Sequence, residues 1–225
     1  MSGTGKEDED MKIIHQTAEY VVVCKAAGED SEHDLPGLLA EQNGDRATDY
    51  YVVHRLDQAA AGLLVLARNR QTAGELSCQL TENRLRKRYL CVVPGVPEPA
   101  SGEMQDLLYK DKTKQKMFPV KRKRADVKEA SLTYRVLETQ APLALAEVEL
   151  QTGRFHQIRC QFAARKLPLV GDGKYGSRVR SPHLALFCQQ LSFYDAKEKK
   201  ELCFTAAPPA EFPWTAFSCA SDEAE

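Results

Sequence analysis

Short apolar runs rich in β-branched residues follow one another along this chain, with few helical segments between them. Such runs, bounded by turn residues, are typical of β-strands. Five of them read as strands: residues 20–24, 62–67, 88–93, 130–137 and 143–150. Only residues 72–83 and 155–166 carry apolar side chains at helical spacing. The sequence therefore predicts a mixed α/β (α+β) fold, with a mostly antiparallel sheet flanked by helices.

The chain length and the composition of its ends indicate one domain. At 225 residues it can bury one sizeable core, and no repeat or linker divides it. Residues 1–10 and 217–225 are acidic and poor in apolar side chains, which predicts disordered tails around a domain spanning 11–216. No apolar run reaches membrane-spanning length. Seven cysteines without Cys-x-x-Cys spacing favour reduced thiols and a cytosolic protein.

The charge distribution indicates a polyanionic partner. The formal net charge is −1, but both tails are acidic, so the chain between them is basic. Residues 110–128 hold nine Lys and Arg against two Asp, and residues 84–88 hold four more. A solvated loop would explain one such cluster. Two clusters together with further arginines, Arg154 among them, favour a surface that faces phosphates.

Several common catalytic constellations do not occur in the sequence. The five histidines lack metal-ligand spacing, and no Gly-x-Ser-x-Gly turn or phosphate-binding P-loop is found. Asp57 remains, just before the apolar run 62–67, with Arg159 on the second predicted helix. An Arg brought to an Asp in a cleft keeps a nucleophilic carboxylate charged where water is scarce. Alternatively, Arg159 is a surface helix residue.

Three motifs in register carry a resemblance to a known family. They are His54-Arg55-Leu56-Asp57 with the run 62–67, Arg86-Lys87-Arg88-Tyr89 continuing to Gly95, and Thr152-Gly153-Arg154-Phe155-His156-Gln157-Ile158-Arg159. Their order is similar to that of the RluA-type RNA pseudouridine synthases, and the resemblance spans about residues 12–207. It implies an enzyme that detaches uracil from its ribose in RNA and reattaches it through carbon.

The resemblance also implies roles for individual residues. Asp57 corresponds to the essential carboxylate, and attack at ribose C1′ and at uracil C6 both fit. Arg159 would hold that carboxylate ionised, and Tyr89 would stack on the uracil and move the proton lost from C5. Arg55 would fill the space left by the extruded nucleotide. Further residues are expected to shape the loop or contact RNA: His54, Lys87, Arg154 and Ile158.

Some positions depart from the family pattern and leave the substrate open. Gln58-Ala59-Ala60-Ala61 follows Asp57 where an acidic or hydroxyl residue is usual, and Phe155 replaces a common Thr. We expect a monomer that modifies ribosomal or transfer RNA with no metal, no organic cofactor and no membrane contact. A catalytically silent RNA-binding or ribosome-assembly protein is the main alternative, and a DNA-acting enzyme is a weaker one.

Overall fold

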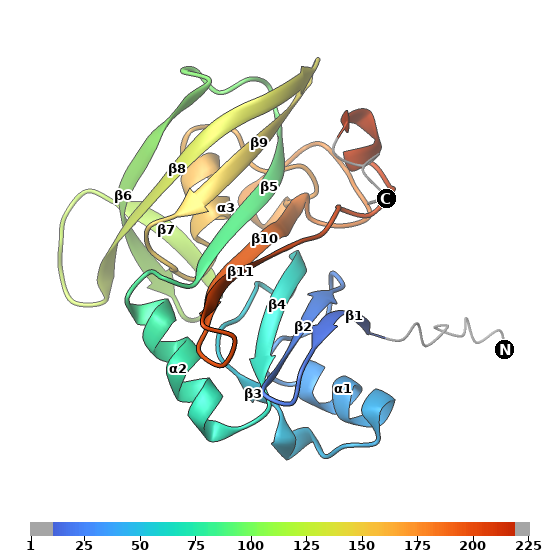
Figure 1. The fold of residues 1–225 in the computed structure, drawn as a ribbon. Coiled ribbons are helices and arrows are strands. Elements are labelled where there is room, and N and C mark those ends of the chain that lie inside the picture. Colours follow the sequence, from blue (N-terminus) through green and yellow to red (C-terminus); the bar gives the residue numbers. More distant parts are fainter. Residues whose placement is uncertain (1–10, 219–225) are drawn as a thin grey trace, which may run out of the picture.

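All eleven strands of the described part of the chain, residues 11–218, join one sheet in the computed structural model (Figure 1). The strands are β1 (Lys12–Gln16), β2 (Tyr20–Lys25), β3 (Tyr51–Val52), β4 (Ala61–Ala67), β5 (Arg86–Pro94), β6 (Ser101–Asp111), β7 (Lys116–Val120), β8 (Val127–Gln140), β9 (Leu143–Leu150), β10 (Leu186–Asp195) and β11 (Lys200–Thr205). Three α-helices accompany them: α1 (Leu35–Asn43), α2 (Arg70–Thr81) and α3 (Gln157–Ala164). Within the described residues, no helix combines the length and apolarity that a membrane span requires.

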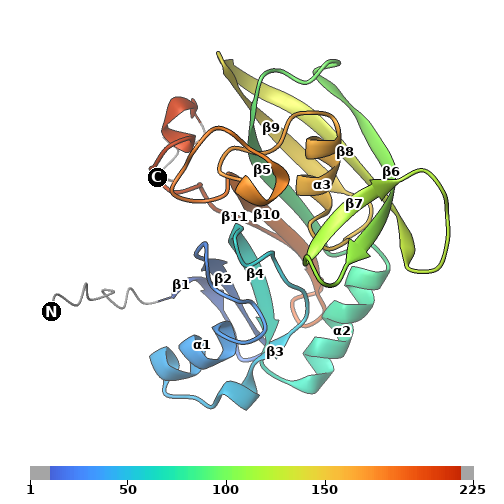
Figure 2. The ribbon, with the colours of Figure 1, turned by 180° about the vertical axis from the view of Figure 1, so that it is seen from behind.

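The sheet narrows to a seam between β4 and β10. The strand order is β1-β2-β4-β10-β5-β9-β8-β6-β7, with β3 added to β4 and β11 added to β10. Only β10 and β4 pair in parallel, through two residue pairs, Phe187 with Ala61 and Cys188 with Gly62. The seam separates a small lobe, β1 to β4 with α1, from a large lobe that contains β5 to β9 and α3 (Figures 1 and 2). The expectation of a mixed, mostly antiparallel sheet is confirmed.

The core explains why the central strands form. Residues 21–23 of β2 and 63–66 of β4 are fully buried, so these strands are apolar on both faces. A second apolar cluster covers the other face of the sheet, where Trp214 packs edge-on against Phe187. Phe217 is buried in this cluster, and Ser218 donates hydrogen bonds to Glu138. The remainder of both expected tails lies outside the described residues.

Several boundaries differ from the predictions. Helix α3 begins at Gln157, two residues after the predicted start, because His156 has a left-handed φ of 48° and cannot be helical. Strand β6, which starts at Ser101, is not among the predicted strands. Helix α1 was missed, although Pro36 in its first turn and a left-handed Gly44 at its end are helix boundary signals.

The seam between the lobes requires glycine at position 62. Gly62 has a φ of 114°, and a Cβ there would collide with the backbone of Cys188. We expect Gly62→Ala to lower the free energy of unfolding by at least about 2 kcal/mol, through strain and the clash. Gly74 in α2 has open space around its Cα, so Gly74→Ala should raise stability slightly. Denaturant unfolding of both variants tests this, and equal stability of Gly62→Ala and wild type would contradict it.

Candidate active site

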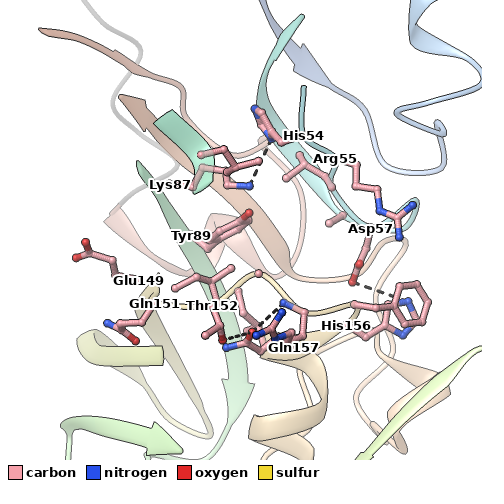
Figure 3. Close-up of a pocket in the computed structure, with 18 of the residues that line it drawn as sticks. His54, Arg55, Asp57, Lys87, Tyr89, Glu149, Gln151, Thr152, His156 and Gln157 are labelled. Carbon is pink, nitrogen blue, oxygen red and sulfur yellow. Dashed lines mark hydrogen bonds and ion pairs between the residues drawn. The ribbon is translucent and has the colours of Figure 1, made fainter. Parts of the chain in front are cut away.

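A cleft of about 650 Å³ lies between the two lobes. Three segments that are distant in sequence line it: the loop that carries residues 54–57, the start of β5, and residues 149–158 between β9 and α3 (Figure 3). Seven of the eight residues predicted for the site line this cleft, and Arg159 is the exception. The structure therefore brings the three sequence motifs to one place.

A buried lysine holds the loop that carries Asp57 in place. Lys25, at the end of β2, is 1% exposed, and its Nζ donates to the carbonyl oxygens of Ala26, Glu29 and Gln58. Gly28 and Gln58 exchange two further hydrogen bonds. Because Gln58 follows Asp57 directly, these bonds fix the position of the carboxylate in the cleft.

Arg159 does approach Asp57, but its main partner is a second aspartate. Its Nη1 lies 3.4 Å from Asp57 Oδ2. Its Nε and Nη2 donate to the two oxygens of Asp172 at 2.7 and 2.9 Å, which is bidentate geometry. The Asp172 and Arg159 side chains are 1% and 6% exposed. Asp172 therefore holds the guanidinium, which presents its remaining nitrogen to Asp57.

The surroundings of Asp57 favour a reactive carboxylate. Its side chain is 17% exposed. Burial raises the pKa of Asp57 above its ordinary value, while the Arg159 guanidinium and the backbone N–H of His156 partly offset this rise. A carboxylate that is poorly solvated yet held by a cation retains nucleophilicity that water would suppress.

Tyr89 and Lys87 project from β5 into the cleft from the same face of the strand (Figure 3). Tyr89 is 5% exposed, and burial raises the pKa of its hydroxyl well above 10, so the phenol stays protonated. The described residues offer this hydroxyl no hydrogen-bond partner. It is thus available to a ligand in the cleft.

His54 and Lys87 contact each other in the cleft through side-chain nitrogens. The backbone N–H of Val65 donates to His54 Nε2 at 3.3 Å, so the ring proton resides on Nδ1. Nδ1 lies 3.4 Å from Lys87 Nζ, and only an uncharged amine can accept its proton. Burial lowers the pKa of Lys87, so its amine loses its proton more readily than that of an exposed lysine.

We expect the Lys87 amine to become reactive at lower pH than an ordinary lysine. Competitive acetylation with trace acetic anhydride, followed by mass spectrometry of peptides across a pH series, measures this at each lysine. The reactivity of Lys87 should reach half its maximum below the usual value of about 10.4. A midpoint at or above that value would show that Lys87 is an ordinary ammonium group.

The other predicted residues lie at the rim or on the floor of the cleft. Arg55 is exposed and pairs with Glu32 at 3.0 Å, outside the cleft floor. Arg154 is also exposed, and its Nε donates to the carbonyl of Glu129. Ile158 is 4% exposed and forms part of the apolar floor. The two arginines are exposed and can turn toward an incoming polyanion, whereas Ile158 can contact only a group inside the cleft.

Sequence reasoning missed two polar residues of the site, Asp172 and His156. Nothing in the sequence showed that Asp172 would face Arg159. His156 lies 3.9 Å from Asp57 through Nε2. Its φ of 48° is a structural property that sequence spacing does not reveal.

Comparison with known proteins identifies the family. A family model described as RNA pseudouridylate synthase matches residues 15–164. The chain belongs to this family. It is 36% identical over 163 residues to an uncharacterized RNA pseudouridine synthase of Chloroflexus aurantiacus, covering 71% of this chain and 50% of the relative. It is 32% identical to the ribosomal large subunit pseudouridine synthase D of Xanthomonas campestris, covering 78% and 52%.

A solved structure supports the same assignment. Human RNA pseudouridylate synthase domain containing 4 superposes with a TM-score of 0.74 at 25% identity, over 93% of each chain. The predicted resemblance to RluA-type pseudouridine synthases is confirmed. The present chain spans about half the length of the two bacterial relatives.

Proposed function

We propose that this protein isomerises uridine to pseudouridine in RNA, with Asp57 as the nucleophile. The observation that carries the proposal is the pairing of the Asp57 carboxylate with Arg159 at 3.4 Å, inside a cleft built by the family's motifs. During the reaction the carboxylate bonds to the target nucleotide, the N1–C1′ bond breaks, the uracil turns, and a C5–C1′ bond forms. The carboxylate is then released, C5 loses its proton, and N1 gains one. Tyr89 provides a protonated hydroxyl and a ring face for the base.

We propose that the cleft receives a single extruded nucleotide, so that the target uridine leaves the RNA stack. Unstacking costs a few kcal/mol, which contacts to the extruded base and its neighbours offset. Arg55, exposed at the rim beside Asp57, is the side chain placed to occupy the vacated space. The family membership and the rim position of this arginine support base extrusion as part of the proposed function.

The basic segments supply a surface for the RNA backbone. Lys112 and Lys114 are exposed in the turn between β6 and β7, and residues 121–124 are exposed after β7. Arg86 and Arg154 lie at the rim of the cleft. Cations at these positions would neutralise phosphates on either side of the target, giving binding that weakens as salt rises. We propose ribosomal RNA as the substrate, because a relative of 32% identity is named for the large ribosomal subunit.

The experiment that tests the function uses RNA from a strain that lacks the gene. Incubation of this RNA, labelled with tritium at uracil C5, should release tritium and create pseudouridine in the nuclease digest. Pseudouridine mapping of the same RNA identifies the position and distinguishes ribosomal from transfer RNA. Binding without tritium release would instead favour the catalytically silent RNA-binding protein.

A further inference from the structure

His156 occupies a position next to the reacting carboxylate that the proposed function does not use. It caps α3 in a left-handed conformation and is 7% exposed. Its backbone N–H donates to the Asp57 carboxylate, and its ring Nε2 lies 3.9 Å from Asp57 Oδ2. Figure 3 shows the ring and the carboxylate facing each other across the floor of the cleft.

Hydrogen bonding on the far side of the ring fixes which nitrogen carries the proton. The backbone N–H of Met117 donates to the hydroxyl oxygen of Tyr175 at 2.8 Å. This hydroxyl lies 3.2 Å from His156 Nδ1 and has its own proton to donate. Nδ1 is then the acceptor, so the ring proton resides on Nε2 and faces Asp57. The opposite tautomer would leave the phenol proton unbonded and direct a nitrogen lone pair at the carboxylate.

Further contacts hold the ring in place and keep it uncharged. Phe155 stacks on His156 with ring centroids 3.7 Å apart, and the Lys110 ammonium lies 4.2 Å above Phe155. Three cations, Arg159, Lys174 and Lys110, face the ring, and Asp57 and Tyr175 are its other polar neighbours. Burial, followed by these cations, lowers the pKa of His156 to about 3, so the imidazole is neutral at physiological pH.

We propose that His156 is a positioning residue for the nucleophile: its Nε2–H, directed by Tyr175, closes onto Asp57 Oδ2 when the cleft is occupied and orients the carboxylate for attack. The inference rests on the proposed function. From 3.9 Å a small shift of the ring brings Nε2–H into hydrogen-bond range of Oδ2, and catalytic hydrogen bonds commonly shorten in the substrate complex. Arg159, 3.4 Å away, is similarly loose, so both donors have room to approach the same oxygen.

Three substitutions separate this role from a purely structural one. In His156→Gln the amide nitrogen reaches the position of Nε2 and can donate to Asp57, whereas in His156→Asn it reaches only the position of Nδ1. His156→Ala has no donor. Asn tolerates a left-handed φ best of the three, so a structural role would rank the Asn variant first. We expect the reverse order, with kcat lowered about tenfold in Ala and Asn and within about threefold of wild type in Gln.

The pH dependence of kcat/KM gives a second measure. An N–H donor stabilises the ionised form of the carboxylate, so its loss raises the pKa of Asp57 and moves the acid limb to higher pH. We expect a shift of about one pH unit or less in His156→Ala and a smaller one in His156→Gln. An unchanged acid limb in His156→Ala, or an Asn variant as active as wild type, would overturn the proposal.

A measurement without substrate distinguishes failure of this inference from failure of the proposed function. Nitrogen-15 NMR of histidine-labelled protein reports which imidazole nitrogen is protonated, and the His156→Gln variant identifies the His156 signals. We expect a proton on Nε2 that persists without titration through neutral pH, and a mixture of tautomers in Tyr175→Phe. A proton on Nδ1 would overturn the inference whether or not the protein modifies RNA.

Discussion

Replacing Asp57 by Asn should lower the rate of tritium release from uracil C5 by about 10⁴-fold or more, because the nucleophile itself is lost. Asn keeps the size of the side chain and the polar contact with Arg159, so the shape of the cleft is retained. Stability should be equal to or higher than that of wild type, since burial disfavours the ionised carboxylate in the folded state. RNA affinity should change little, because the cationic surface is intact.

The control for this prediction is Glu147→Gln, which removes an acidic side chain outside the cleft. Glu147 pairs with Arg135 across two strands of the large lobe. Its loss should leave tritium release at the wild-type rate. Equal rates for wild type and Asp57→Asn would remove Asp57 from the mechanism.

Replacing Asp172 by Asn should have the largest effect on stability of any substitution in the site. The guanidinium of Arg159 would keep its burial and lose the charge that compensates it, which costs about 3 kcal/mol or more. The released guanidinium would also lose its direction toward Asp57, and misplacement of this order lowers a rate by about 10²-fold. Denaturant unfolding and the tritium assay measure the two effects separately.

An exposed ion pair provides the matched control. Lys123 and Glu129 pair at 2.7 Å, with side chains 71% and 69% exposed. Solvent screening leaves such pairs little net stabilisation, so Glu129→Gln should barely alter unfolding. If Asp172→Asn were as mild as Glu129→Gln, the Arg159–Asp172 pair would not be the anchor of the site.

The sequence indicated those parts of the fold that depend on local pattern. Strands β2, β4 and β5 were predicted because apolar residues occupy both faces of buried strands, and the mostly antiparallel sheet followed from the scarcity of helices. The parallel contact between β4 and β10 was not predictable, because it joins residues more than a hundred positions apart through two residue pairs. Helix α1 was missed because its nine residues contain Pro36 and Gly37, which lower helix propensity.

In the candidate site, too, the local motifs were predictable and the long-range contacts were not. Motifs identified Asp57, Tyr89 and Arg159, and the structure brings them to one cleft or its floor. The partner of Arg159 was assigned incompletely, since a guanidinium has several donors and the sequence does not show which acceptor takes two of them. The lowered pKa of Lys87 was also not predictable, because it follows from burial of the side chain in the folded chain.

The narrow seam between the lobes has a consequence for how the candidate site assembles during folding. Asp57 precedes β4 on one side, while Arg159 and Asp172 belong to the other, so neither half alone contains a competent centre. On the proposed function, the reaction therefore requires the pairing of β4 with β10 that joins the two lobes. A partly folded chain could hold RNA through its lysines and arginines, yet it would leave every uridine unaltered.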